Sequence, residues 1–228
     1  MLVEDLGERR TEFREELLAF SSPRIYSLGS MSERIALFLI FFPVFLFSLS
    51  FHEASHAWTA NRLGDPTAKL MGRMTLNPLA HIDWIGTVLF PLMMFLMPGL
   101  LLFGWARPVP VDPRNLRGGR KGNLRVAAAG PLSNLFLAIV FAGLLHLLVF
   151  SPFRGQTASI VAQVFETGVY LNLMLAFFNL IPIHPLDGSQ VMAGILRERH
   201  LEGFERINRY GFLILIACLY FGIFRYLT

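Results

Sequence analysis

The clearest chemical signal in the sequence is a run of five residues, His52-Glu53-Ala54-Ser55-His56, which forms an HExxH pattern. On a helix, residues four apart share a face, so the two imidazoles point the same way. Two such nitrogens can hold Zn²⁺, and a glutamate beside the metal can act as general base for its bound water. The pattern therefore predicts a metal-dependent hydrolase. The alternative is a solvated helix end at a membrane surface.

A catalytic zinc site needs a third protein ligand and an open fourth position. A metzincin-type third histidine would fall at Arg62, and no glutamate occurs between Glu53 and Glu166. We favour Asp187, because a carboxylate beside an apolar run and two prolines is costly unless it is paired or bound to metal. The alternative is that Asp187 caps a helix starting near Gly188. The other candidates are His81, Asp65, Asp83, Asp112, Glu166 and His184.

The composition shows what kind of protein must position these residues. Of 228 residues, 54% are hydrophobic and 16% charged, and 22 are Phe. An average soluble protein has about 25% charged residues, so this chain is neither disordered nor an ordinary soluble globule. One cysteine, Cys218, excludes a disulfide scaffold and a cysteine-rich zinc module.

Five apolar runs divide the chain, and the first is long enough to cross a bilayer. We expect an all-α, multi-pass integral membrane protein with a bundle of about 4–6 transmembrane helices. Residues 1–34 are predicted to be a polar extension with a short helix over 8–20, and 35–228 a single intramembrane domain. The runs cover residues 35–60, 85–104, 124–150, 168–183 and 208–224.

The polar loops carry the information on topology. Residues 105–125 hold six Lys or Arg side chains against one acid, Asp112, which is typical of a cytoplasmic loop. Because the positive charge gathers in such loops and forms no basic helix, we expect no nucleic-acid partner. The polar segment 62–84 contains Lys69–Leu76, which is predicted to form a short strand or hairpin able to hold an extended substrate.

If residues 85–104 crossed the membrane completely, the end of the helix that carries HExxH and Asp187 would lie on opposite sides of the membrane. A re-entrant or broken segment removes this conflict, and Pro91, Pro98 and Gly99 permit one. Irregular backbone at that depth is tolerated where it packs in protein or lines water. We therefore favour a re-entrant element after the HExxH helix.

Three motifs in order resemble the site-2 protease family of intramembrane zinc metalloproteases: His52–His56, Ala129–Asn134, and Asn179…Pro182…Pro185-Leu186-Asp187-Gly188. Segments 64–67, 75–83 and 104–110 are similar to those of its compact prokaryotic members, which lack PDZ or CBS domains. The resemblance covers residues 50–200. It implies one Zn²⁺ per chain held by His52, His56 and Asp187, with Glu53 as general base.

The resemblance also implies a lipid bilayer setting, a prokaryotic cell membrane and transmembrane protein substrates, whose peptide bonds are cut in or near their membrane spans. Asn134 matches a family asparagine that binds the scissile peptide or its oxyanion, and an interhelical hydrogen bond is the alternative. His184 stands where the family has proline, so it is a second-sphere partner, an extra ligand or a filler. Rival functions are an intramembrane metal transporter and a non-catalytic scaffold.

Overall fold

The computed structural model describes residues 30–97, 104–153 and 155–221, and every regular element in them is helical. Three helices are long and apolar enough to cross a membrane: α2 (Met31–Arg62), α5 (Gly119–Phe150) and α6 (Gln156–Asn179). This confirms the predicted all-α polytopic fold. The predicted helix over 8–20 and the end of the run at 208–224 lie outside the described residues.

Helix α2 carries the HExxH pattern and has well-defined ends. Ser30 and Glu33 form a capping box at its start, in which each side chain accepts from the other residue's backbone N–H. At its other end the guanidinium of Arg62 stacks 3.8 Å from the ring centroid of exposed Trp58. Trp and Arg at a helix end are typical of a membrane interface, so α2 ends at the membrane surface.

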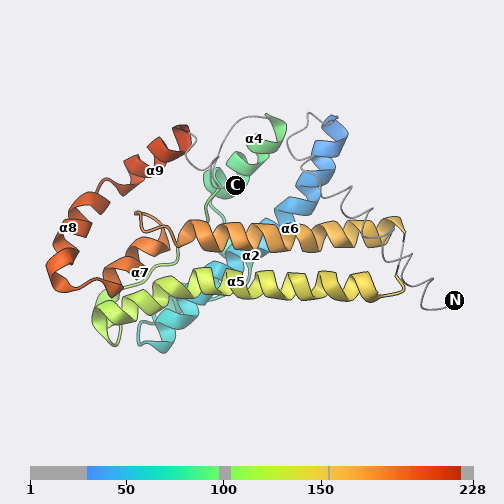
Figure 1. The fold of residues 1–228 in the computed structure, drawn as a ribbon. Coiled ribbons are helices and arrows are strands. Elements are labelled where there is room, and N and C mark those ends of the chain that lie inside the picture. The colour runs from blue at the N-terminus through green and yellow to red at the C-terminus, as the bar shows by residue number, and fades with distance from the viewer. Residues whose placement is uncertain (1–29, 98–103, 154, 222–228) are drawn as a thin grey trace.

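Helices α5 and α6 run antiparallel beside each other, and α2 crosses both of them (Figure 1). Gly168 of α6 allows this approach, because a Cβ there would collide with the ring of Phe141 on α5. The main apolar cluster joins the other faces and consists of Val44, Phe45 and Leu49 from α2 with Leu171 and Leu175 from α6. The two packed faces together fix the register of the three long helices.

The polar segment after α2 contains no strand, so the predicted strand or hairpin at 69–76 is wrong. The chain instead forms α3 (Thr67–Leu70), a turn at Gly72 with φ +68°, and η2 (Pro78–Ala80). Buried Asp65 organises this region by accepting hydrogen bonds from Thr67, Asp112 and Asn115. Burial would raise the pKa of Asp65, but these donors outweigh it and lower the pKa below its usual range.

The next apolar segment has its two ends side by side. It forms η3 (Trp84–Leu89) and α4 (Phe90–Leu96). The Trp105 N–H then donates to the Gly86 carbonyl at 3.2 Å, and the Thr87 hydroxyl donates to the Trp105 carbonyl at 2.7 Å. Since residue 105 lies beside residue 86, the segment starts and ends at the same level. This neighbouring of the two ends is what a re-entrant element requires, and the re-entrant path stays a prediction.

The chain reaches α5 through an extended segment and η4 (Pro113–Asn115). After α6, a loop leads to α7 (Asp187–Ile195), α8 (Glu198–Asn208) and α9 (Gly211–Tyr220). Helix α7 packs on the start of α5, where Asn123 donates to Gln190 at 2.8 Å and Gly194 meets Leu124. This packing brings the loop after α6 back toward the HExxH face of α2.

Candidate metal centre

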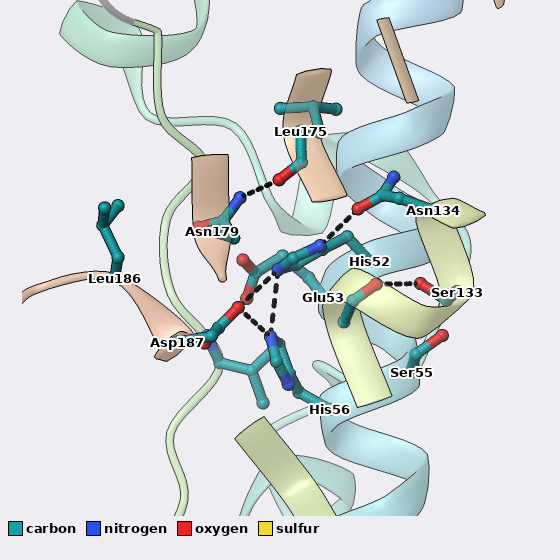
Figure 2. Close-up of polar contacts among 12 residues, drawn as sticks. His52, Glu53, Ser55, His56, Ser133, Asn134, Leu175, Asn179, Leu186 and Asp187 are labelled. Carbon is teal, nitrogen blue, oxygen red and sulfur yellow. Dashed lines mark hydrogen bonds and ion pairs between the residues drawn. The ribbon is translucent and has the colours of Figure 1, made fainter. Parts of the chain in front are cut away.

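His52, His56 and Asp187 converge at one point in the fold (Figure 2). The Nε2 atoms of the two histidines are 3.0 Å apart. Oδ2 of Asp187 lies 3.0 Å from Nε2 of His52 and 3.3 Å from Nε2 of His56. Both histidines are buried, and Asp187 is partly buried. Among the described residues, this is the one group of histidine, cysteine and acidic side chains close enough to hold a metal ion.

The outer nitrogen of each imidazole is occupied. Nδ1 of His56 lies 2.7 Å from the Val126 carbonyl, which can only accept, so this nitrogen carries the proton. Nδ1 of His52 lies 2.5 Å from Oδ1 of Asn134. In the neutral form each ring therefore presents an unprotonated Nε2 to the other ring and to the carboxylate. Three acceptors then face one another, which is the arrangement that a cation between them would satisfy.

The orientation of Asn134 depends on a second asparagine, Asn172 of α6. The Asn172 amide nitrogen donates to the Gly168 carbonyl at 2.8 Å and to the Ser48 hydroxyl at 2.9 Å. Its oxygen consequently faces Nδ2 of Asn134 at 2.8 Å. Asn134 must then present its own oxygen to His52. A backbone carbonyl of α6 thus fixes the tautomer of a histidine on α2 through two buried amides.

This arrangement places Asn134 behind His52. Its side chain is fully buried, and its amide donates to Asn172 and, at 3.4 Å, to the Ser48 carbonyl. These are interhelical hydrogen bonds, the alternative considered for this residue. The sequence motifs did not include Asn172 or Ser48. The amide of Asn172 within the apolar run of α6 could have indicated an interhelical contact, because polar groups in a membrane span are rare without a partner.

A glycine makes room for the metal centre. Gly130 of α5 lies directly against the two rings, and a Cβ at this position would clash with Nε2 of His56 and lie 2.5 Å from Nε2 of His52. The Ala129–Asn134 motif therefore brings α5 to the histidines with no side chain between them. Gly188 acts similarly beside Asp187, because a Cβ there would collide with the carbonyls of Leu180 and Ile181.

Glu53 lies beside the histidines but outside the ligand group. It is 9% exposed, and its Oε2 accepts a hydrogen bond of 2.9 Å from the Val109 N–H. It is therefore next to the three converging side chains without being one of them. Val109 belongs to the extended segment before η4, and no sequence signal connected it with Glu53.

The remaining candidate ligands are distributed elsewhere. Buried His81 donates from Nε2 to the Thr75 carbonyl, and Asp83 and Asp112 cap η3 and η4. Asp65 is bound by its four donors, and Glu166 lies midway along α6. The His184 N–H donates to Asn208 at 2.7 Å, and the residue lines an open hollow with Glu205 and Arg209. None of these joins the group formed by His52, His56 and Asp187.

We expect Asn172→Leu to weaken zinc binding about 10- to 100-fold, because partners that orient a histidine ligand typically contribute that much. The variant keeps the number and branching of the side-chain heavy atoms and frees Asn134 to rotate. Zinc affinity measured by competition with a chelator checks this result. Gln163→Leu, which removes an amide about 2.5 turns away on the same helix, is the matched control. Equal affinities in the wild type and Asn172→Leu would contradict the orienting role.

Comparison with known proteins places these features in a family. The model of peptidase family M50 matches residues 148–221. YwhC of Bacillus subtilis is 36% identical over 174 residues, 75% of each chain. Rip2 of Mycolicibacterium smegmatis is 28% identical over 189 residues, 81% of this chain and 68% of its own. Zinc metalloprotease MJ0392 of Methanocaldococcus jannaschii is 25% identical over 201 residues, 87% of this chain and 47% of its own.

No solved structure matches the chain. The similarity to YwhC extends over three quarters of both proteins, and these relatives are all prokaryotic. The predicted resemblance to site-2 proteases, the integral membrane setting, the enzyme class and the zinc cofactor are confirmed at the level of the family. The chain belongs to peptidase family M50.

Proposed function

We propose that this chain is an intramembrane zinc metalloprotease that cuts peptide bonds in or near the membrane spans of other proteins. The convergence of two imidazole Nε2 atoms and one carboxylate oxygen on helices of a membrane bundle carries the proposal. His52, His56 and Asp187 would hold the metal, one ion per chain. Two imidazoles and one carboxylate match the ligand set of catalytic zinc, which leaves a fourth position open.

Zinc bound there would lower the pKa of a water molecule toward 7 and polarise the scissile carbonyl. Glu53 would take a proton from the attacking water and pass it to the leaving amine. Asn134 and the Val126 carbonyl would keep the imidazoles in the required tautomer. Asn134 itself would act as a positioning residue, since its oxygen and its amide are already bonded within the bundle.

A helical substrate must unwind locally before this site can cut it, because its scissile carbonyl is hydrogen-bonded within the helix. Segment 62–84 has no strand edge that would hold it extended. The intact Glu53 beside the ligand group distinguishes a hydrolase from a metal-transit site, which would need only the ligands. It also argues against a non-catalytic scaffold.

The metal content of the purified protein tests the proposal. We expect about one zinc per chain in the wild type and a large loss in Asp187→Ala, beyond the roughly 10- to 100-fold typical of outer-sphere partners. Glu202→Ala, an acid removed from exposed α8, serves as the control. A wild type that takes up no zinc after resupply would overturn the mechanism. Unchanged zinc in Asp187→Ala would show that another residue is the third ligand.

A further inference from the structure

A buried arginine lies close to the metal centre and has no role in the mechanism above. Arg73, between α3 and η2, is 8% exposed. Its Nη2 donates to the Arg107 carbonyl at 2.7 Å and to the Pro108 carbonyl at 3.2 Å. Its Nε is buried and has no hydrogen-bond partner among the described residues. Burying a guanidinium is costly, so its position calls for an explanation.

Both carbonyls belong to residues 105–110, which we call the strap. The strap is extended, and alternate residues bond inward along one edge: Trp105 N–H to Gly86, Arg107 N–H to His81, and Val109 N–H to Glu53. Val109 lies between Pro108 and Pro110, which have no N–H. Its amide is therefore the only donor that this part of the strap can offer to Glu53.

Arg73 and Glu53 hold the two ends of one peptide group. The Pro108 carbonyl and the Val109 N–H belong to the same peptide bond, so Arg73 binds its oxygen while Glu53 binds its hydrogen. The positive charge beside the peptide oxygen and the negative charge beside the peptide hydrogen both increase the polarity of this group, so each hydrogen bond strengthens the other. Burial and the nearby Arg107 lower the pKa of Arg73, whereas the negative charge of Glu53 acts to raise it. Arg73 and Glu53 thus lie on opposite sides of one peptide group, close enough for their charges to attract.

We propose that Arg73 is a positioning residue for peptide hydrolysis: by binding the Arg107 and Pro108 carbonyls, it holds the Val109 N–H on Oε2 of Glu53. This leaves Oε1 of Glu53 to accept the proton of the attacking water. The inference rests on the proposed function, in which Glu53 is the general base. It assigns Arg73 no contact with the metal or the substrate.

The test compares Arg73→Met with Arg73→Lys. We expect Arg73→Met to lower kcat about 10- to 100-fold with KM nearly unchanged, because misplacing a catalytic group slows the reaction without weakening substrate binding. Lysine keeps the charge and three donors, so it should restore part of the loss. Arg206→Met, which removes an exposed guanidinium from α8, should leave kcat unchanged. A fluorescent single-span membrane peptide in liposomes is the substrate.

Amide hydrogen exchange in the zinc-loaded protein provides a readout independent of activity. The Val109 amide should exchange faster in Arg73→Met, as it should in Glu53→Ala, and remain protected in Arg206→Met. Unchanged protection in Arg73→Met would overturn the inference. Equal activity losses in Arg73→Met and Arg73→Lys would also overturn it, since a role in packing alone does not depend on the donors.

The outcomes also separate this inference from the proposed function. Full turnover in Arg73→Met, beside an inactive Glu53→Gln, would refute the role of Arg73 and leave the protease mechanism intact. A zinc-loaded Glu53→Gln that still cleaves would refute the mechanism, and with it the reason for holding Glu53.

Discussion

Gly130→Ala is expected to abolish zinc binding and turnover while leaving the helices folded. The added methyl would occupy the space between α5 and the two Nε2 atoms of His52 and His56. The rings cannot easily retreat, because their Nδ1 atoms are hydrogen-bonded to Asn134 and Val126. Alanine favours a helix interior by about 1 kcal/mol over glycine, which offsets part of the roughly 1–3 kcal/mol that the clash costs, so we expect the helices to stay folded.

Gly143→Ala is the matched control for this variant. It lies on the same helix, and its Cβ would meet nothing within 4 Å. Zinc per chain, helix content and thermal unfolding should be measured on both variants beside the wild type. Gly143→Ala should keep its zinc. A zinc-loaded, active Gly130→Ala would show that the histidines can move away from α5, and the close approach would then not be a requirement of the site.

Glu53→Gln is expected to keep its zinc and lose about 10²- to 10⁴-fold in kcat, the range that a positioned general base contributes. Glu53 lies outside the ligand group, and its contact is the Val109 N–H. The amide oxygen of glutamine can accept the same hydrogen bond, so the strap should stay in place. What the variant loses is the ability to take up a proton from water.

Cleavage of the single-span peptide by zinc-loaded protein checks this expectation, and Glu202→Gln on exposed α8 is the control. Zinc content must be measured in the same samples, because only a loss of turnover at full occupancy identifies the base. If the glutamine variant cleaved the peptide at the wild-type rate, another group would have to accept the proton.

The parts of the site that depend on spacing along the chain could be predicted from the sequence. His52 and His56 share a helical face because they are four residues apart on one helix, and this does not depend on what packs against the helix. Asp187 could be selected because a carboxylate beside an apolar run needs a partner. The re-entrant segment could be expected from its prolines and from the need to bring these residues together.

The parts that depend on register between helices could not be predicted in this way. Asn172 reaches Asn134, and Gly130 meets the histidines, only because α2, α5 and α6 pack at one particular offset. The strand expected at Lys69–Leu76 failed for a related reason. Arg73 of this segment is drawn into the protein by carbonyls more than 30 residues further along the chain, and Gly72 turns the backbone before it.

The return of the chain at Gly86 has a consequence for the fate of cleavage products. It places Gly86 and Trp105 side by side, so the polar segments that flank this apolar stretch lie on the same side of the bundle, the side at which α2 ends. His56 is six residues from the end of α2, which corresponds to a depth of about 9 Å. The positive charge of residues 105–125 favours the cytoplasm as that side. We therefore expect each cut to leave most of the substrate's membrane span in the lipid. The cytoplasmic fragment should carry only a short apolar end, so it should dissociate from the membrane without further help.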